Sequence, residues 1–294
     1  MYKLVCFCAM TAWALSAQTS DGKLRIIAFG AHPDDCDGRV GGTAIKWAVL
    51  GHHVKFVSVT SGDAGHQSEG GGALALRRRA EAKEAGRRFG IDEYETLDNH
   101  DGELVPSLEV RHQIIRRIRQ WNADLVLAPR PWDYHPDHRY TGVLIQDAAY
   151  MVVVPNVCPD TPALRRNPVF MYFQDGFQKP YPFRPDVAVG IEEVIDKKVY
   201  ATDAHTSQMY EWLPWVAGNL DNVPKDPKAR LEWLRMSRGG GRGVSDVMRE
   251  TLKKWYGAQA DSIKAAEAFE VCEYGRRPSE QELRRLFPFF PAGK

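Results

Sequence analysis

The chain has little net charge and few cysteines. Its 294 residues carry 39 basic and 38 acidic side chains, which leaves a formal net charge of +1, and they include only five cysteines. A charge this small gives no overall electrostatic reason to expect nucleic acid or a membrane surface as a partner. The sequence shows no internal repeat, and its 44% of hydrophobic residues is enough for one large domain with a full core.

The chain also lacks a hydrophobic run of transmembrane length. The apolar stretch at residues 4–15 follows a single lysine and leads into Ser16 and Ala17. It is too short for a comfortable membrane span, and the polar residues 18–23 separate it from the first predicted strand. We interpret residues 1–17 as a secretory signal peptide, which predicts an exported protein, periplasmic or secreted, without stable membrane insertion. The alternative is a disordered or buried N-terminal segment.

The number of cysteines in the exported protein follows from that interpretation. Cys6 and Cys8 would leave with the signal peptide, so an odd number of cysteines would remain, and at least one thiol would be free. Cys36 is expected to be a small buried side chain rather than a metal ligand. Cys158 and Cys272 could form a disulfide, and two free thiols are the equal alternative.

Strands and helices alternate up to about residue 150. The predicted strands are residues 24–29, 53–60 and 124–128. The predicted helices are residues 41–50, 74–89, 107–121 and 139–151. This alternation is typical of right-handed crossovers in an α/β fold, so we expect a Rossmann-like, mostly parallel sheet flanked by helices.

The pattern changes after residue 150. Proline-rich connections surround two predicted strands, 169–173 and 186–189, and helices follow. We expect a catalytic α/β domain at residues 22–204 and a helical extension at residues 205–294 packed on it. Residues 61–72 are long and glycine-rich for a connection after a strand. They are expected to be a mobile rim over the site or a plain surface loop.

Two histidine–aspartate clusters carry the chemistry. His32, Asp34 and Asp35 directly follow the first predicted strand, and His135 and His138 shortly follow the strand at 124–128. In an open α/β sheet the carboxyl ends of the strands form the ligand crevice, so the two clusters should meet there. We assign His32, Asp35 and His138 as ligands of a catalytic zinc with one open position for water. Iron(II) could occupy the same ligands.

The remaining polar residues of the clusters are candidates for acid–base work. Asp34 would take the proton of the attacking water, or alternatively would only orient a ligand histidine. His135 is the candidate to stabilise the developing oxyanion or to protonate the leaving amine. Asp137 could hold the His135 ring in the right tautomer, or cap the helix that begins near Arg139. His66, in the glycine-rich loop, could contact the substrate.

These motifs resemble the PIG-L/LmbE family of zinc-dependent N-deacetylases. The resemblance rests on residues 31–35, 41–43, 59–62 and 135–138, with a looser similarity at 205–208. The family hydrolyses the acetamide of N-acetylglucosamine-type sugars. The resemblance implies zinc at His32, Asp35 and His138, with Asp34 as general base and His135 as transition-state stabiliser.

The resemblance also implies two substrate contacts, and the chain departs from the family pattern at two places. Arg78 would contact sugar hydroxyls and Asp101 would hold the sugar, whereas a solvated helix charge is the plain interpretation of Arg78. Cys36 and Asp37 stand where many members have a glutamate, and Asp133 stands where some sugar-thiol deacetylases have a tyrosine. The second departure weakens any transfer of those enzymes' substrate to this chain.

We therefore expect a zinc-dependent N-deacetylase that acts on a small-molecule or oligosaccharide substrate. One alternative is a zinc amidase that cleaves a larger acyl group, and another is a metal-dependent sugar-binding protein without turnover. The tryptophans of the C-terminal part have no family role and are expected to pack in the core, although exposed ones would suit stacking on carbohydrate. These are Trp212, Trp215, Trp233 and Trp255.

Overall fold

The computed structural model describes residues 21–239 and 243–291. The predicted signal peptide, residues 1–17, lies outside the described residues. Within the described part, no helix is both long and apolar enough to cross a membrane.

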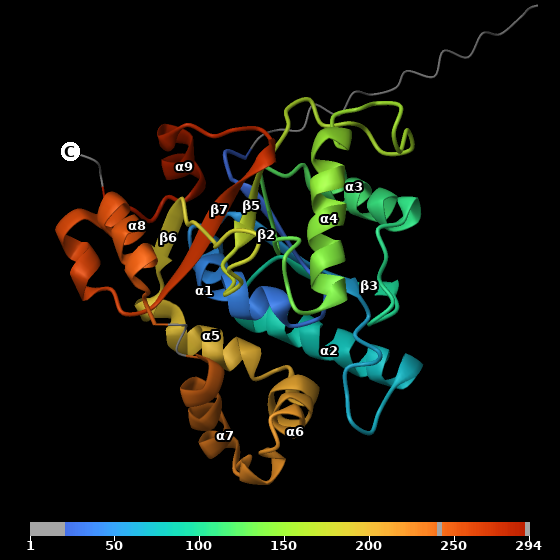
Figure 1. The fold of residues 1–294 in the computed structure, drawn as a ribbon, viewed down its shortest axis with the longest axis vertical. Coiled ribbons are helices and arrows are strands. Elements are labelled where there is room, and N and C mark those ends of the chain that lie inside the picture. Colours follow the sequence, from blue (N-terminus) through green and yellow to red (C-terminus); the bar gives the residue numbers. More distant parts are fainter. Residues whose placement is uncertain (1–20, 240–242, 292–294) are drawn as a thin grey trace, which may run out of the picture.

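The centre of the structure is a seven-stranded sheet in the order β3-β2-β1-β4-β5-β7-β6 (Figure 1). The strands are β1 (Arg25–Gly30), β2 (His53–Thr60), β3 (Glu93–Asn99), β4 (Leu125–Ala128), β5 (Val169–Phe173), β6 (Val187–Gly190) and β7 (Ala266–Gly275). Strands β1 to β5 run parallel to one another, and β7 is antiparallel to both β5 and β6. The predicted α/β, mostly parallel sheet is confirmed.

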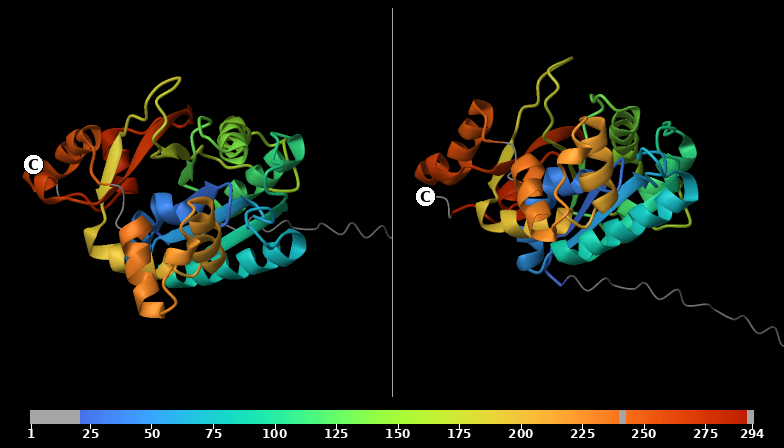
Figure 2. Two further views of the ribbon diagram at one scale, coloured as in Figure 1. Left: turned by 60° about the horizontal axis from the view of Figure 1, so that its bottom comes forward. Right: turned by 90° about the horizontal axis from the view of Figure 1, so that it is seen from below.

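Helices cover both faces of this sheet (Figure 2). The main ones are α1 (Asp35–Val49), α2 (Gly71–Phe89), α3 (Leu108–Trp121), α4 (Pro136–Met151), α5 (Ile195–Thr202), α7 (Pro227–Leu234), α8 (Asp246–Tyr256) and α9 (Glu280–Leu286). One core layer includes Trp47 of α1 and Phe89 of α2, and the other includes Ile114 of α3 and Leu144 of α4. Each layer buries one face of the central strands, which explains why these strands are apolar on both sides.

The chain order creates a switch point between β1 and β4. From β1 the chain moves outward through β2 to β3, and it then returns to β4 on the other side of β1. The loops that follow β1 and β4 therefore diverge and leave a crevice at the carboxyl ends of the strands. His32 lies in the first loop, and His135 lies at the start of the helix that follows the second.

The C-terminal part enters the sheet, which corrects the prediction of a purely helical extension at residues 205–294. Strand β7 lies between β5 and β6, and its Glu267 is only 4% exposed. The Glu267 carboxylate accepts hydrogen bonds from the backbone of Gly42 and Thr43 and from Nζ of Lys198. Sequence periodicity could not place β7, because its pairing partners lie about a hundred residues earlier in the chain.

Three further differences concern local structure. Strand β3 was not predicted, because as an edge strand it is polar and largely half-buried. Helices α1, α2 and α4 begin three to six residues before their predicted starts. Cys36, Cys158 and Cys272 are all free and buried, so the disulfide between Cys158 and Cys272 is not formed. The expectation that Cys36 is a small buried side chain is met, since it is 1% exposed.

Candidate metal centre

Three side chains of the predicted ligand set converge at the switch point. Nδ1 of His32 lies 3.1 Å from Nε2 of His138 and 3.6 Å from a carboxylate oxygen of Asp35. Nε2 of His138 lies 3.4 Å from the other oxygen of Asp35. His32 and Asp35 come from the turn between β1 and α1, and His138 comes from the first turn of α4.

This spacing fits a single small metal ion. Two ligand atoms that are each about 2.0–2.1 Å from a tetrahedral zinc lie about 3.3 Å apart. The two imidazole nitrogens, 3.1 Å apart, are close to that value, and Asp35 approaches each of them with a different oxygen, at 3.4 and 3.6 Å. Two imidazoles and one carboxylate are a typical ligand set for catalytic zinc and leave its fourth position open. The same set also suits iron(II).

Acidic residues behind His32 fix its tautomer. Nε2 of His32 lies 3.0 Å from Asp101 and 3.3 Å from Asp137. With its proton on Nε2 and shared with these carboxylates, the ring turns the lone pair of Nδ1 towards the metal position. A carboxylate behind a ligand histidine is the usual arrangement in zinc proteins, and it raises the basicity of the ligand.

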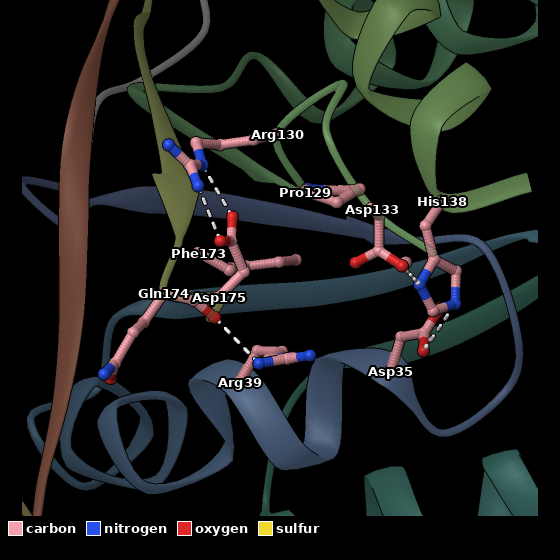
Figure 3. Close-up of a pocket in the computed structure, with 10 residues that line it drawn as sticks. Asp35, Arg39, Pro129, Arg130, Asp133, His138, Phe173, Gln174 and Asp175 are labelled. Carbon is pink, nitrogen blue, oxygen red and sulfur yellow. Dashed lines mark hydrogen bonds and ion pairs between the residues drawn. The ribbon is translucent and has the colours of Figure 1, made fainter. Parts of the chain in front are cut away.

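His138 is supported in the same way by Asp133. Nδ1 of His138 lies 2.9 Å from Asp133, so Nε2 carries the lone pair that faces Asp35 (Figure 3). The Asp133 carboxylate also accepts the backbone N–H of His135. In the sequence, Asp133 stands out only as a departure from a tyrosine. Its position in the chain, five residues before His138, is the signal that could have suggested this role.

Asp34 stands apart from the converging set and pairs with a cation. Its carboxylate accepts a hydrogen bond of 3.1 Å from Nη2 of Arg78, whose side chain is only 2% exposed. Burial raises the pKa of Asp34, and the nearby charge of Arg78 lowers it. Burial also raises the pKa of Asp35, but His138 and His32 outweigh it and hold that pKa well below the usual range.

His135 lines the same space from the start of α4. Its ring centroid lies 4.6 Å from that of His32 and 5.1 Å from that of His138. Nδ1 of His135 accepts the backbone N–H of Asp137, so the neutral ring carries its proton on Nε2. Burial lowers the pKa of His135, and His32 and His138 lower it further. The ring is therefore a neutral hydrogen-bond donor near pH 7.

Asp137 takes a different place from the one predicted. It is fully buried, and its carboxylate accepts the backbone N–H groups of Gly102 and Leu104 in addition to its contact with His32. The helix cap is His135, not Asp137. Asp137 thus supports His32 and the loop after β3, while the side chain of His135 is held by the helix start itself.

The three predicted substrate contacts are largely engaged inside the protein. Arg78 pairs with Asp34, and Asp101 supports His32 while one of its oxygens lies 3.8 Å from Arg78. His66 is buried, and both of its ring nitrogens are used, one by Glu211 and the other by backbone N–H groups of its own loop. The loop at residues 61–72 is therefore tied to the C-terminal part through His66.

A small pocket adjoins the convergent residues (Figure 3). Asp35, Asp133 and His138 form one side of it, and the buried ion pair of Arg130 and Asp175 forms the other. Its lining is completed by Gly30, Arg39, Pro129, Phe173 and Gln174.

The part of the chain that contains this site is similar to known proteins. The family model described as PIG-L, GlcNAc-PI de-N-acetylase, matches residues 27–149, which contain all three converging residues. The chain is 33% identical over 199 residues to the diacetylchitobiose deacetylase of Thermococcus kodakarensis. That match covers 65% of this chain and 73% of the relative.

Solved structures share the fold. The N,N'-diacetylchitobiose deacetylase of Pyrococcus horikoshii matches with a TM-score of 0.62 at 24% identity, over 84% of this chain and 83% of that one. GalB of Pseudomonas putida, a 4-carboxy-2-hydroxymuconate hydratase, matches with a TM-score of 0.62 at 20% identity, over 87% and 99%. The same fold thus carries more than one chemistry, and the activity has to be argued from the site.

Proposed function

Because this chain belongs to the PIG-L family of de-N-acetylases, we propose that it is a zinc-dependent enzyme that removes the N-acetyl group from an N-acetylglucosamine-type sugar or glycoconjugate. The observation that carries the proposal is the convergence of His32, Asp35 and His138 at 3.1–3.6 Å, with the carboxylate of Asp34 left outside the set. A site that only bound sugar would not need this additional carboxylate.

Asp34 acts as the general base. Zinc at the convergent position would supply a Lewis acid that polarises the acetyl carbonyl and favours attack by water near neutral pH. Asp34 accepts the proton of the attacking water; burial raises its pKa, and the charge of Arg78 opposes that rise. Asp34 also precedes Asp35 directly in the chain, which keeps the base next to the ligand set.

His135 stabilises the charge that develops on the acetyl oxygen. Its Nδ1 is occupied by the backbone of α4, so Nε2–H is the donor that remains for the substrate. A neutral donor held in place before the reaction stabilises an oxyanion without a proton transfer of its own. The proton held by Asp34 then passes to the amine that leaves.

The substrate class rests on the relatives and the pocket together. The Thermococcus kodakarensis relative is a diacetylchitobiose deacetylase and is 33% identical, which supports an N-acetylated amino sugar. The fold alone does not support it, since GalB shares the fold and is a hydratase. The pocket beside His138 and Asp35 lies next to the position of the reacting amide.

Acetate release by the zinc-loaded protein tests the proposal. The panel consists of N-acetylglucosamine, chitooligosaccharides and peptidoglycan fragments. We expect release that stops with a chelator and returns with zinc. Release of a bulkier acid from other N-acyl amines, without acetate, would instead indicate the wider amidase activity. No hydrolysis of any amide, with zinc shown to be bound, would overturn the proposal.

We also propose that the protein is exported. The support is the pattern of residues 1–17, one lysine followed by a short apolar stretch and small residues. The N-terminal sequence of the protein recovered from the periplasm or medium tests this. A mature chain that begins within a residue or two of Gln18 is expected, and an intact Met1 in the cytoplasm would contradict it.

A further inference from the structure

Two tryptophans of the C-terminal part form a stacked pair that the chemistry described so far does not use. Trp212 ends a short π-helix, Ser207–Trp212, and Trp215 lies in α6, Leu213–Val216. Their ring centroids are 5.3 Å apart and their planes differ by 17°. Trp215 is 51% exposed, whereas Trp255, in the same part of the chain, is 2% exposed and packs in the core.

The pair is held against the loop that borders the metal centre. Nε2 of Gln208 donates to the carbonyl of Gly65 at 2.9 Å, and His66 contacts Glu211 at 2.9 Å. Arg77 of α2 binds the same Glu211. These contacts join the π-helix that contains Trp212 to the loop and to α2.

Trp212 also faces the residues that surround the base. A Cβ atom placed on Gly65 would lie 3.0 Å from Nη1 of Arg78, 3.2 Å from Oδ2 of Asp101 and 4.0 Å from Nε1 of Trp212. Gly65 is thus packed closely against the guanidinium of Arg78 and the carboxylate of Asp101, and the indole N–H of Trp212 lies on the same side of this glycine. Among the described residues, the N–H of Trp212 has no hydrogen-bond acceptor, in contrast to those of Trp47, Trp121 and Trp255.

We propose that Trp212 and Trp215 form a sugar-binding subsite next to the metal centre, so that the preferred substrate is an oligosaccharide rather than a monosaccharide. The inference rests on the proposed deacetylase function. The N–H of Trp212 binds a hydroxyl group of the sugar. The exposed face of Trp215 packs against the next pyranose ring.

The chemistry of the pair favours a carbohydrate as the occupant. A pyranose ring presents C–H groups on its face and hydroxyls at its edge, and an indole offers an apolar face and one N–H donor. Gly65 lies beside both Trp212 and Asp101, and Asp101 contacts the ligand histidine His32 at 3.0 Å. The subsite is therefore continuous with the site of hydrolysis, as an extended glycan requires.

Length preference measured on the zinc-loaded enzyme tests the subsite. The substrates are N-acetylglucosamine and triacetylchitotriose, and the readout is kcat/KM for acetate release. Trp215→Ala should lower the value for the trisaccharide by roughly 3- to 10-fold more than the value for the monosaccharide, which is the size of one aromatic contact. Tyr150→Ala is the matched control, because Tyr150 is 69% exposed but lies at the opposite end of α4 from His138.

A binding measurement gives a readout that needs no turnover. Addition of triacetylchitotriose to the metal-free protein should change the tryptophan fluorescence in a saturable way. Trp215→Ala should remove most of this change, and Trp212→Phe, which keeps a ring but loses the N–H, should weaken binding.

The outcomes separate the two proposals. If the wild-type enzyme releases acetate and Trp215→Ala keeps the same length preference, the subsite is wrong and the deacetylase function stands. If no substrate yields acetate but the fluorescence titration saturates and depends on Trp215, the deacetylase function is wrong and the subsite stands. A titration without change overturns the subsite, and the exposed pair would then be a contact surface for a protein.

Discussion

The guanidinium of Arg78 binds the carboxylate of Asp34 at 3.1 Å while it is almost fully buried itself. The relationship explains how a base can remain ionised in a closed site. Burial raises the pKa of Asp34, and only Arg78 among its close neighbours is permanently charged and positive. A buried arginine on α2 thereby acts on the reaction through Asp34 rather than as a solvated surface charge.

Replacement of Arg78 should shift the pH profile. In Arg78→Met the Asp34 carboxylate loses the cation that lowers its pKa, so that pKa rises. Since the base must be ionised, the acidic limb of kcat against pH should move to higher pH. Arg87→Met, an exposed change on the same helix, is the control. An acidic limb that does not move would contradict the assignment of Asp34 as the base.

Asp34→Asn should separate metal binding from turnover. The side chain keeps its size but cannot accept a proton, so kcat should fall by about 10²–10⁴-fold, the usual contribution of a general base. The zinc content of the purified variant, measured by elemental analysis, should equal that of the wild type. Loss of zinc in this variant would mean that Asp34 is a ligand.

Removal of the charge behind His138 should weaken metal binding. In Asp133→Asn, Nδ1 of His138 loses its carboxylate partner at 2.9 Å, and the affinity for zinc should fall by about 10- to 100-fold. Competition with a chromophoric chelator measures the affinity. Asp160→Asn, which removes an exposed partner of Arg116, should leave the affinity at the wild-type value. Equal affinities for both variants would argue against His138 as a ligand.

The buried pair of Glu267 and Lys198 should be essential for stability. Their side chains are 5% and 4% exposed and 2.7 Å apart, and Glu267 also accepts hydrogen bonds from α1. Glu267→Gln leaves the Lys198 charge buried without its partner, and the free energy of unfolding should fall by about 3–5 kcal/mol. Urea titration measures this. Glu273→Gln, at an exposed position of β7, should cost almost nothing.

His53 should make stability depend on pH in a defined direction. Hydrogen bonds to Asp92 and Asp21 raise its pKa above 6.5 in the folded state. The protonated His53 therefore stabilises the folded state fully at a pH below the pKa of His53 in the unfolded chain. This stabilisation is lost as the pH rises through the pKa of His53 in the folded protein. The difference in Tm between the wild type and His53→Asn should be larger at about pH 5.5 than at about pH 8.5. An equal difference at both values would contradict it.

Much of the site could be predicted because its residues lie close to one another in the sequence, in two short clusters. His32 and Asp35 share one turn after an apolar strand, and His135 and His138 share the first turn of a helix. Patterns of this kind specify where each strand ends, and the topology of an open parallel sheet then brings the strand ends together. The α/β class followed from the same alternation of strands and helices.

The supporting residues could not be predicted in the same way. Asp101 and Asp137 contact His32 across 69 and 105 residues of the chain, so the sequence singled out both residues but not their contact with His32. Strand β3 was missed because its exposure as an edge strand removes the apolar signal. Strand β7 was missed because its pairing with β5 and β6 is a long-range, antiparallel contact.

The fold class, the two clusters at the strand ends and the family could be inferred from the amino-acid sequence, because each depends on the local spacing of residues and on the hydrophobic pattern. Only the tertiary structure decided which carboxylate serves which imidazole, that Arg78 is buried beside Asp34, and that Trp212 lies next to the loop of Gly65. The reason is physical. Local pattern sets the conformation of a segment, but pKa values, tautomers and binding surfaces depend on the distances between segments, and packing alone sets those distances.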